Sequence, residues 1–566
     1  MNISPFDLFA AGQLGEAEAA FRRALARTPR DPDLVSGLGL VLFQRGKADE
    51  GLRLVRRASQ LAPDQPGYLV NLGALLLSAG RAAEAEAPVR EAATRLPRVA
   101  PVRVMLGRVL RALGRTAEAV RAFEDAITLD PRQSAAHREL GLLATDRGDL
   151  DGALAHLRQA VAVQSGDAEA HLALARTLMA AGRWDEGLAA AERAVRLAPN
   201  LADAHAAHGL ALHELGRPAE AAAAHERAAR LAPHEAGHRL TRGAALLDAG
   251  DAAAAEADFR AVLARTPDAA AAHNNLGAAL RAQGRLEAAE AAFRAAVRHA
   301  PAHPQASRNL ARLLLDHGRT DEAAAVLRAW AAADPDNPVA AHMLASLGGG
   351  PAPERASDGF VKAAFDGFAA TFERTLGGLG YQAPQRIADA LGRFLPAASG
   401  DLAVLDAGCG TGLCAPLLRP YARHLSGVDL SPGMLAQARA RGLYDELDEA
   451  ELTAYLRGRP GAFDLVVAAD VLCYFGALGD VLAAARASLA GGGGSGGALL
   501  AFTVEHAADP PAEGYVLNAH GRYAHGEDHL RGTLAGAGLT VRLMETVTLR
   551  REAGVPVEGR LIVAAA

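Results

Sequence analysis

The sequence predicts an all-α array of helical hairpins followed by an α/β domain with a parallel sheet. Glycine and proline recur at a fixed interval over residues 1–345, and a glycine- and proline-rich stretch occupies residues 346–357. From about residue 400 onward, short apolar runs alternate with helical stretches. We therefore expect a repeat array at 1–345, a linker at 346–357 and an α/β domain at 358–566.

Glycine recurs every 34 residues across ten units of the first part. We expect each of these glycines to end the first helix of a hairpin, because glycine accepts a left-handed backbone at little cost. A proline, Pro29 in the first unit, then ends the second helix. The helix-ending glycines are Gly12, Gly46, Gly80, Gly114, Gly148, Gly182, Gly216, Gly250, Gly284 and Gly318. A further set inside the first helices admits the paired helix: Gly39, Gly73, Gly107, Gly141, Gly209, Gly243 and Gly277.

This hairpin pattern resembles the tetratricopeptide repeat family. The resemblance implies helix pairs stacked into a superhelix whose concave groove holds a protein or peptide partner. A partial final helix that begins at Pro338 is expected to cap the stack. From helix spacing, the groove should include Leu142, Arg176, Met179, Leu210, His213, Leu247 and Arg281. This set carries no dominant charge, so the ligand stays unnamed.

Histidine also recurs at one repeat position. A ladder of metal ions is conceivable, but neighbours one repeat apart are poorly placed to share one ion. We interpret the four as repeat-consensus residues at a hairpin contact and expect no metal. They are His137, His171, His205 and His273.

Composition limits the class of protein. The three cysteines cannot form a disulfide framework and match no common zinc spacing, so we expect small buried residues in a reducing compartment. No secretory signal or membrane span is visible, which predicts a cytoplasmic protein without a membrane partner. Basic and acidic residues balance in the repeats, so the net charge of −6 lies on the second part. Nucleic acid is therefore an unlikely partner.

Six apolar runs in the second part predict strands, and a weaker third strand is expected near Glu449–Leu452. A parallel α/β order follows from the helical stretches between these runs. The expected strands are Ala403–Ala407, Leu425–Leu430, Phe463–Ala469, Ala498–Val504, Leu539–Leu549 and Gly559–Ala565.

A glycine-rich turn, Asp406-Ala407-Gly408-Cys409-Gly410-Thr411-Gly412, follows the first of these strands. Such a turn lets a nucleotide approach the backbone closely. The dinucleotide pattern requires another glycine at the position of Leu413. In addition, the Asp406 carboxylate would repel a pyrophosphate but suits a ligand with an ammonium group. The motif therefore predicts a nucleoside ligand without phosphates.

The ends of the next strands supply further candidate contacts. Asp429 ends the second strand, where a carboxylate can accept hydrogen bonds from both ribose hydroxyls. Ser431 should cap a helix that places Met434 against the adenine. Asp470 ends the strand after Phe463 and should lie beside the reactive group of the ligand.

Together these motifs resemble the class I S-adenosylmethionine-dependent methyltransferases, which have a Rossmann-like fold. The flanking segments, such as Tyr381-Gln382-Ala383-Pro384, resemble a bacterial branch in which such a domain is fused to tetratricopeptide repeats. The resemblance implies S-adenosylmethionine as cofactor. The implied contacts are Asp406, Gly408, Gly410, Gly412, Asp429, Leu430, Met434, Glu451, Leu452 and Asp470.

The methyl acceptor and the catalytic residues are not defined by the sequence. The Asn/Asp-Pro-Pro-Tyr signature of amide and adenine N-methylation is absent, because Asp470-Val471-Leu472-Cys473 stands in that region. Phe365, Phe368 and Phe372 fall on one helical face and could form a lid or simply dock on the sheet. Candidates for the acceptor pocket are Tyr474, Tyr515, His520, Tyr523 and His525, although for any single one of them we favour an ordinary packing or surface role.

Three functions are compatible with these patterns. The first is a methyltransferase whose repeats recruit a protein substrate or partner. The second is a small-molecule methyltransferase whose repeats serve assembly. The third is a non-catalytic scaffold with a decayed enzyme domain, which the intact Asp406 and Asp429 oppose.

Overall fold

The computed structural model describes residues 3–349, 352–366, 369, 372–395, 398, 400–491, 497–552 and 555–566. The chain forms two compact units, Met1–Asp258 and Phe259–Ala566. The division falls inside a repeat helix, so the last repeats belong to the same unit as the α/β fold. No described helix is long and apolar enough to cross a membrane.

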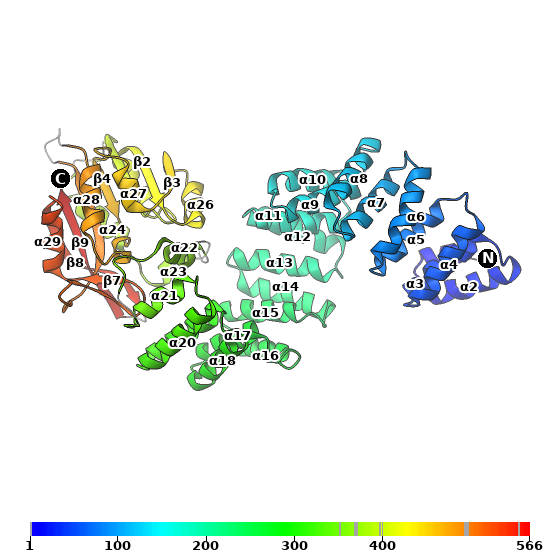
Figure 1. Cartoon of the computed structure of the whole chain (residues 1–566), viewed down its shortest axis with the longest axis horizontal. Coiled ribbons are helices and arrows are strands. Elements are labelled where there is room, and N and C mark those ends of the chain that lie inside the picture. The colour runs from blue at the N-terminus through cyan, green and yellow to red at the C-terminus, as the bar shows by residue number, and fades with distance from the viewer. Residues whose placement is uncertain are drawn as a thin grey trace. The chain divides into compact units, whose positions relative to one another are not determined.

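The first unit consists of helices that pair in chain order as antiparallel hairpins (Figure 1). Its helices are α1 Pro5–Ala10, α2 Leu14–Arg27, α3 Pro32–Gln44, α4 Ala48–Leu61, α5 Gly67–Ser78, α6 Ala82–Arg95, α7 Ala100–Ala112, α8 Thr116–Leu129, α9 Ser134–Asp146, α10 Leu150–Val163, α11 Ala168–Ala180, α12 Trp184–Leu197, α13 Ala202–Glu214, α14 Pro218–Leu231, α15 Ala236–Asp248 and the start of α16 Ala252–Leu263.

The recurring glycines do what the sequence predicts. All ten helix-ending glycines have left-handed backbones, with φ from +70° at Gly318 to +88° at Gly250. The glycines inside the first helices make room for the second helices: a Cβ on Gly73 would lie 2.1 Å from Cγ2 of Val89. The 34-residue period therefore reflects one backbone requirement and one packing requirement in each hairpin.

The second unit begins with the remaining repeat helices. They are α17 Ala270–Ala282, α18 Leu286–His299, α19 Pro304–Asp316, α20 Thr320–Ala333 and α21 Pro338–Ala345. The Asn337 side chain accepts hydrogen bonds from the backbone of Val339 and Ala340, which fixes the start of α21. The expected short final helix at Pro338 is confirmed.

An α/β fold follows, built on a mainly parallel sheet in the order β3-β2-β1-β4-β5. Strand β9 pairs antiparallel with β5 and with β8, and the short β7 pairs with both β5 and β6. The strands are β1 Leu402–Ala407, β2 Ala422–Asp429, β3 Glu446–Glu449, β4 Leu465–Ala468, β5 Leu499–His506, β6 Tyr515–Leu517, β7 Tyr523–His525, β8 Thr540–Glu552 and β9 Val555–Ala565.

Helices cover both faces of this sheet. Ile387 and Leu418 pack with Val404 on one face, whereas Leu456, Leu482 and the α29 side chains pack on the other. The helices are α22 Asp358–Asp366, α23 Phe372–Gly378, α24 Ala383–Leu391, α25 Ala415–Leu418, α26 Pro432–Ala440, α27 Leu452–Arg457, α28 Gly479–Ser488 and α29 Glu527–Gly536, with 3₁₀ turns η2 Arg419–Tyr421 and η3 Leu472–Tyr474. This is the predicted Rossmann-like arrangement.

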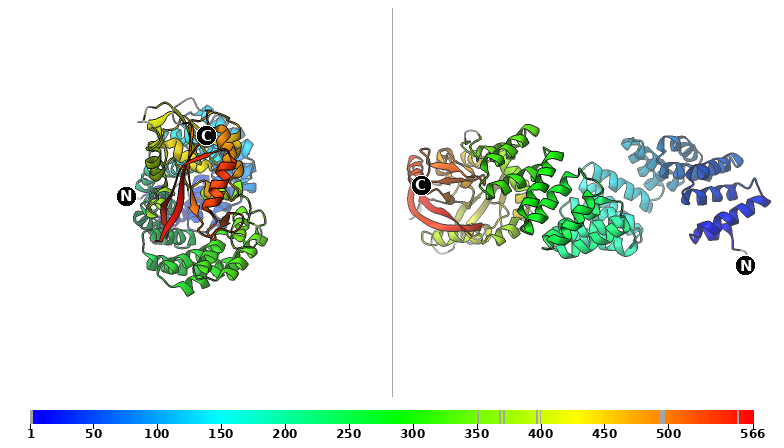
Figure 2. Two further views of the ribbon diagram at one scale, coloured as in Figure 1. Left: turned by 90° about the vertical axis from the view of Figure 1, so that its left-hand side faces the viewer. Right: turned by 90° about the horizontal axis from the view of Figure 1, so that it is seen from below.

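Three details of the sheet differ from the sequence prediction. The third strand is Glu446–Glu449, so its expected position near Glu449–Leu452 is wrong. It is a short edge strand of acidic residues and Leu447, which gives little apolar signal. The hairpin of β6 and β7 is additional. Strands β8 and β9 are longer than expected and run as a curved pair at the red end of the chain (Figure 2).

Candidate cofactor and acceptor site

The strand order reverses between β1 and β4, and the glycine-rich turn lies at the carboxyl end of β1. Ligands of open α/β sheets bind at such reversal points. Gly408, Gly410 and Gly412 all have positive φ, at +68°, +54° and +84°. A Cβ on Gly408 would lie 2.4 Å from Cγ2 of Val471, the residue after Asp470, so this glycine also allows close packing.

Asp429 joins the end of β2 to the glycine turn. Its Oδ2 accepts a hydrogen bond from the Gly410 amide at 2.9 Å, and its Oδ1 accepts one from the Ser431 amide at 2.9 Å. Burial raises the pKa of Asp429, while these amide hydrogen bonds lower it. The carboxylate is therefore held rigidly beside the turn, in the position predicted from the sequence.

Asp406, the last polar residue of β1, is 1% exposed. The Tyr444 hydroxyl donates a hydrogen bond to its Oδ2 at 2.6 Å. Burial raises the pKa of Asp406 to about 7, against the opposing effect of the Tyr444 hydrogen bond. A carboxylate in this state gains by pairing with a cation such as an ammonium group.

Helix α26 begins where the sequence predicts, because the Ser431 hydroxyl accepts a hydrogen bond from the Met434 amide at 3.1 Å. Met434 is 1% exposed. Asp366, at the end of α22, accepts hydrogen bonds from the Ser431 hydroxyl and, at 3.4 Å, from the Gly433 amide. The segment before the sheet therefore covers the start of α26.

Glu451 and Leu452 lie at the start of α27 rather than on a strand. The Glu451 carboxylate accepts hydrogen bonds from the Thr453 and Ala454 amides at 3.0 and 2.8 Å. Leu452 is 7% exposed and packs in the core cluster of the sheet face. Capping and packing account for both residues, and their contact with an adenine stays a prediction.

Asp470 follows β4 and is the one described residue other than glycine with a left-handed backbone, at φ 54°. Thr503 holds it, since the Thr503 hydroxyl lies 2.9 Å from both the Asp470 amide and its Oδ1. Arg550 approaches Oδ2 at 3.3 Å. Strained backbone held by neighbouring groups is a common feature of functional sites.

A buried ionic network surrounds Asp470 at the carboxyl ends of β4 and β5. The Arg550 guanidinium, which is 2% exposed, contacts Glu505 and lies 2.8 Å from Glu552. Arg522 approaches Glu505 at 3.0 Å and Glu552 at 2.5 Å. This network places three carboxylates and two guanidinium groups beside the expected position of the methyl group.

The structure divides the five acceptor-pocket candidates into two groups. His520 lies 3.4 Å from Glu505 and belongs to the ionic network. Tyr474 carries a phenol whose pKa is raised by burial, with Asp470 nearby. The other three lie in one aromatic cluster, in which the Tyr515 ring centroid is 6.0 Å from that of Tyr523 and 6.1 Å from that of His525.

Packing explains this aromatic cluster. Tyr523 and His525 are both fully buried. Burial lowers the pKa of His525 to about 3, so it stays neutral. The Tyr523 hydroxyl donates to the Pro353 carbonyl at 2.6 Å.

The linker and the last repeat helix are bonded to the loops that carry Tyr474 and His520. The Ala356 amide donates to the Tyr474 carbonyl at 2.8 Å, and the Gly476 amide donates to the Glu354 carbonyl at 2.8 Å. His342 on α21 donates from Nε2 to the Gly521 carbonyl at 2.8 Å. Within the second unit, the last repeat helix and the linker are thus bonded directly to the loops that carry Tyr474 and His520. We call this part of the α/β fold, with the Asp470 network, the acceptor side.

The expected phenylalanine face is divided between two helices. Phe365 lies on α22 and Phe372 on α23, with ring centroids 6.0 Å apart. Phe365 also packs edge-on against Tyr474 at 5.6 Å. Phe368 lies outside the described residues. These contacts bring the segment before the sheet onto the acceptor side of the site, and a lid role stays a prediction.

The recurring histidines are structural, as the sequence predicts. Each places Nε2 near the carbonyl of the residue six positions earlier, at the turn between hairpins: 3.2 Å for His137 and Pro131, and 2.8 Å for His273 and Pro267. His171 and His205 repeat the contact. In contrast, Met179 is only 5% exposed, so the expectation that it lines the groove is wrong. It packs where Gly187 of α12 approaches α11.

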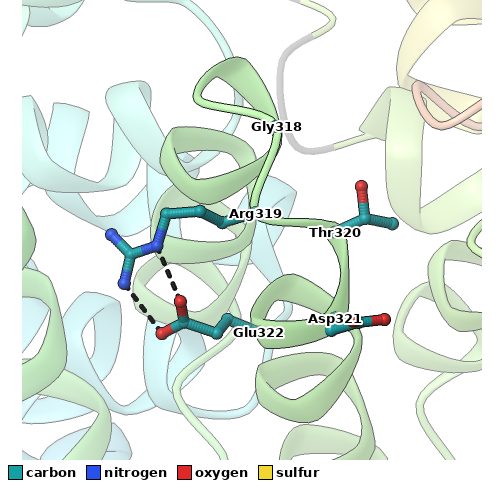
Figure 3. Close-up of a pocket in the computed structure, with 5 residues that line it drawn as sticks. All are labelled: Gly318, Arg319, Thr320, Asp321 and Glu322. Atoms are coloured by element: carbon teal, nitrogen blue, oxygen red, sulfur yellow. Dashed lines mark hydrogen bonds and ion pairs between the residues drawn. The ribbon is translucent and has the colours of Figure 1, made fainter.

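A hollow of about 360 Å³ lies at the turn between α19 and α20 (Figure 3). Its lining includes Arg319 and Glu322, whose Nε and Oε1 atoms are 2.7 Å apart. The same pair recurs in other repeats, for example Arg115 with Glu118 at 2.6 Å. The hollow therefore belongs to the repeat turn, and we assign it no ligand.

One set of metal-ligand atoms comes together among the described residues. Asp203, Glu235 and His238 present these atoms within 4.8 Å of one another. However, Arg176 already pairs with Asp203 at 2.9 Å, and the Glu235 side chain is 63% exposed. An ion pair explains the cluster without a metal ion.

Comparisons with known proteins agree with this division of the chain. A family model described as a methyltransferase domain matches residues 405–495. Models described as tetratricopeptide repeat match residues 8–76, 144–211 and 280–347, residues 104–169 and 240–304, and residues 66–91. The chain therefore carries tetratricopeptide repeats and a C-terminal methyltransferase domain.

A human relative, methyltransferase-like protein 27, is 38% identical over 141 residues, which cover 23% of this chain and 58% of the relative. The crystal structure of YrrB, described as a TPR protein with an unusual peptide-binding site, is 24% identical and covers 34% of this chain and 98% of its own, with a TM-score of 0.31. A thermophilic TPR protein from Thermus thermophilus is 28% identical and covers 32% of this chain and 100% of its own, with a TM-score of 0.30.

Sequence reasoning missed several residues of the site. Two tyrosines and two arginines reach the site from loops or from the far strand β8: Tyr444, Tyr381, Arg522 and Arg550. Burial raises the pKa of the Tyr381 phenol well above its usual value, with Asp470 and Cys414 nearby. Tyr381 lies in a segment noted for its family resemblance, but no local pattern indicated a place in the site for any of the four, because long-range folding brings them together.

Proposed function

We propose that this protein is an S-adenosylmethionine-dependent methyltransferase whose repeats bind a protein or peptide partner. The observation that carries the proposal is the pair of carboxylates beside the glycine turn, the buried Asp406 and the half-buried Asp429. The proposed cofactor contacts are those expected from the sequence: Asp406, Gly408, Gly410, Gly412, Asp429, Leu430, Met434, Glu451, Leu452 and Asp470.

The two carboxylates fit the polar groups of this cofactor. Asp406 would accept the ammonium group, because an ionised carboxylate at this buried position lacks another cationic partner among the described residues. Each carboxylate oxygen of Asp429 accepts one backbone hydrogen bond and would accept a ribose hydroxyl with a remaining lone pair. When bound, the cofactor supplies a methyl group on a positively charged sulfur.

The residues of this chain would act mainly by positioning. With the cofactor bound, the methyl group would pass to the acceptor in a one-step displacement, and the sulfur would keep the electron pair of the broken bond. Tyr474, His520 and the Asp470 network would hold the acceptor in line, which supplies much of the acceleration in such a displacement. The three carboxylates and two guanidinium groups of this network leave a net negative charge, which would stabilise positive charge as it develops on the acceptor.

The contacts between the last repeat and the acceptor side favour recruitment over simple assembly. His342 and the linker carbonyl of Glu354 hold the loops that carry Gly521 and Gly476. A partner held by the repeats would therefore be tethered near the acceptor loops, which raises its effective concentration there.

Calorimetric titration with S-adenosylmethionine tests the cofactor. We expect binding by the full chain and a loss of at least tenfold in Asp429→Ala, because a charged hydrogen-bond acceptor contributes about 1.5–3 kcal/mol. The matched control is Asp401→Ala, which removes an exposed carboxylate at the opposite end of β1. Absence of binding by the wild-type chain would leave the non-catalytic scaffold as the better explanation.

Transfer of a radiolabelled methyl group to proteins tests the recruitment. Leu210 on α13 is 44% exposed and lies on the expected groove face, so Leu210→Glu should reduce labelling of a protein acceptor. Leu286→Glu on α18 is the control, because Leu286 is 38% exposed but outside that face. Equal labelling by both variants, or labelling of small molecules alone, would contradict recruitment through the groove.

A further inference from the structure

We propose that Tyr444 is a positioning residue of the cofactor site, whose hydroxyl orients the Asp406 carboxylate toward the amino-acid end of the methyl donor. This inference rests on the proposed function and deepens it. Tyr444 lies between α26 and β3, outside every motif that the sequence reveals.

The hydrogen bond is specific for one carboxylate oxygen. The Tyr444 hydroxyl donates to Asp406 Oδ2 at 2.6 Å. Within the described part of the chain, Oδ1 accepts no hydrogen bond from another residue. One oxygen is therefore anchored, and the other remains available for the ammonium group.

Two glycines make room for the Tyr444 ring. A Cβ on Gly412, in the glycine turn, would lie 3.0 Å from Cε2 of Tyr444. A Cβ on Gly427, on β2, would lie 2.9 Å from Cε1. The preceding helix end also holds the turn, because Arg441 Nε donates to the Thr411 carbonyl at 2.6 Å. The ring thus enters between β2 and the glycine turn, and its hydroxyl reaches the carboxylate.

The alternative is that Tyr444 only fills space between these elements. Phenylalanine would fill the same space, so the hydroxyl alone separates the two roles. A positioning hydroxyl should affect ligands that carry an ammonium group and leave other ligands unchanged. A packing role would affect every ligand of the turn equally.

The pH dependence of methyl-donor affinity, which follows the ionisation of Asp406, provides a second test of the proposal. The titratable and charged groups that face it are Tyr444, Asp429, Cys409 and Cys414. The Tyr444 hydrogen bond lowers the pKa of Asp406, and Asp429 raises it. Since the ammonium group binds the ionised carboxylate, affinity for the donor should rise with pH through the pKa of Asp406. Loss of the hydroxyl should move that rise to higher pH.

The experiment compares two ligands on the full chain by calorimetry between pH 6 and 8. S-adenosylmethionine carries the ammonium group, and 5′-methylthioadenosine has the same adenosine and sulfur without the amino-acid end. For Tyr444→Phe we expect about a tenfold loss of S-adenosylmethionine affinity at pH 7, unchanged 5′-methylthioadenosine affinity and a midpoint shifted to higher pH. Tyr421→Phe is the control, since its hydroxyl has no hydrogen bond within the described residues.

A double substitution checks that Tyr444 acts through Asp406. In an Asp406→Asn background, Tyr444→Phe should cause no further loss of S-adenosylmethionine affinity. Equal weakening of both ligands, or undiminished S-adenosylmethionine affinity in Tyr444→Phe, would overturn the positioning role while leaving the proposed function intact. A wild-type chain that binds 5′-methylthioadenosine but not S-adenosylmethionine, or neither, would overturn both.

Discussion

His342, on the last helix of the repeats, donates a hydrogen bond from Nε2 to the Gly521 carbonyl of the α/β fold at 2.8 Å. The two residues are 179 positions apart in the chain. The imidazole is buried and packs against the Phe360 ring with centroids 3.9 Å apart. Within the second unit, this contact makes the end of the repeats part of the folded methyltransferase domain.

Replacing His342 with alanine should therefore destabilise the second unit. The variant loses a buried hydrogen bond and ring packing, for which we expect about 2–3 kcal/mol in the free energy of unfolding. Differential scanning calorimetry should show a lower midpoint for this unit. His317→Ala is the control, because among the described residues the His317 side chain hydrogen-bonds the Leu313 carbonyl of the preceding helix, at 2.7 Å, and no group of the α/β fold.

The same contact predicts a pH dependence. Burial lowers the pKa of His342, so the folded protein holds the neutral form. The unfolded state then binds more protons, and stability falls as the pH drops below about 6.5. The wild-type curve should be steeper than that of His342→Ala between pH 6.5 and 5. Parallel curves would show that this histidine does not titrate with unfolding.

Arg550 should contribute strongly to the free energy of unfolding of the second unit, because it pairs with buried carboxylates. Arg550→Met leaves Asp470 buried without its cation and Glu505 with Arg522 alone, and breaking a buried ion pair typically costs about 3–5 kcal/mol. Arg542→Met on the same strand is the control, since Arg542 is exposed. Chemical unfolding would measure both, and a loss below about 1 kcal/mol for Arg550→Met would contradict a tightly coupled network.

Two glycines of the turn that follows β1 should respond differently to alanine. Gly410→Ala imposes only the strain of a left-handed alanine, about 1–2 kcal/mol, because no atom lies within 4 Å of the added Cβ. Gly408→Ala adds an overlap with Val471 at 2.4 Å and should lower the thermal midpoint further. Adding Val471→Ala should restore part of that difference. Equal midpoints for the two single variants would contradict the close packing.

The repeats offer a similar comparison within one helix, α5. Gly73→Ala would place a Cβ 2.1 Å from Val89 and should destabilise the first unit by about 1–3 kcal/mol. Gly67→Ala meets nothing within 4 Å and should be neutral or stabilising by up to about 1 kcal/mol, because alanine favours the helix. Urea unfolding monitored by circular dichroism would distinguish them. A stabilised Gly73→Ala would show that the hairpin can open without cost.

Backbone conformations that only certain residues can adopt, and motifs of closely spaced residues, allowed much of this protein's structure to be predicted from its sequence. A left-handed helix end needs glycine in every hairpin, so Gly12 and its equivalents reveal the repeats. A strand, a glycine turn and an acidic strand end must be contiguous or closely spaced, so Asp406 and Asp429 were found with the turn they contact.

Tertiary structure decided the rest. Tyr444 reaches Asp406 across 38 residues, and Arg550 reaches Asp470 across 80. His342 meets Gly521 only because the last repeat packs on the α/β fold. Such contacts depend on how separate elements pack, and neither partner carries a local pattern that names the other. The sequence by itself therefore predicted the fold and the glycine turn. The tertiary structure decided which distant side chains hydrogen-bond, pair with or pack against the residues around that turn.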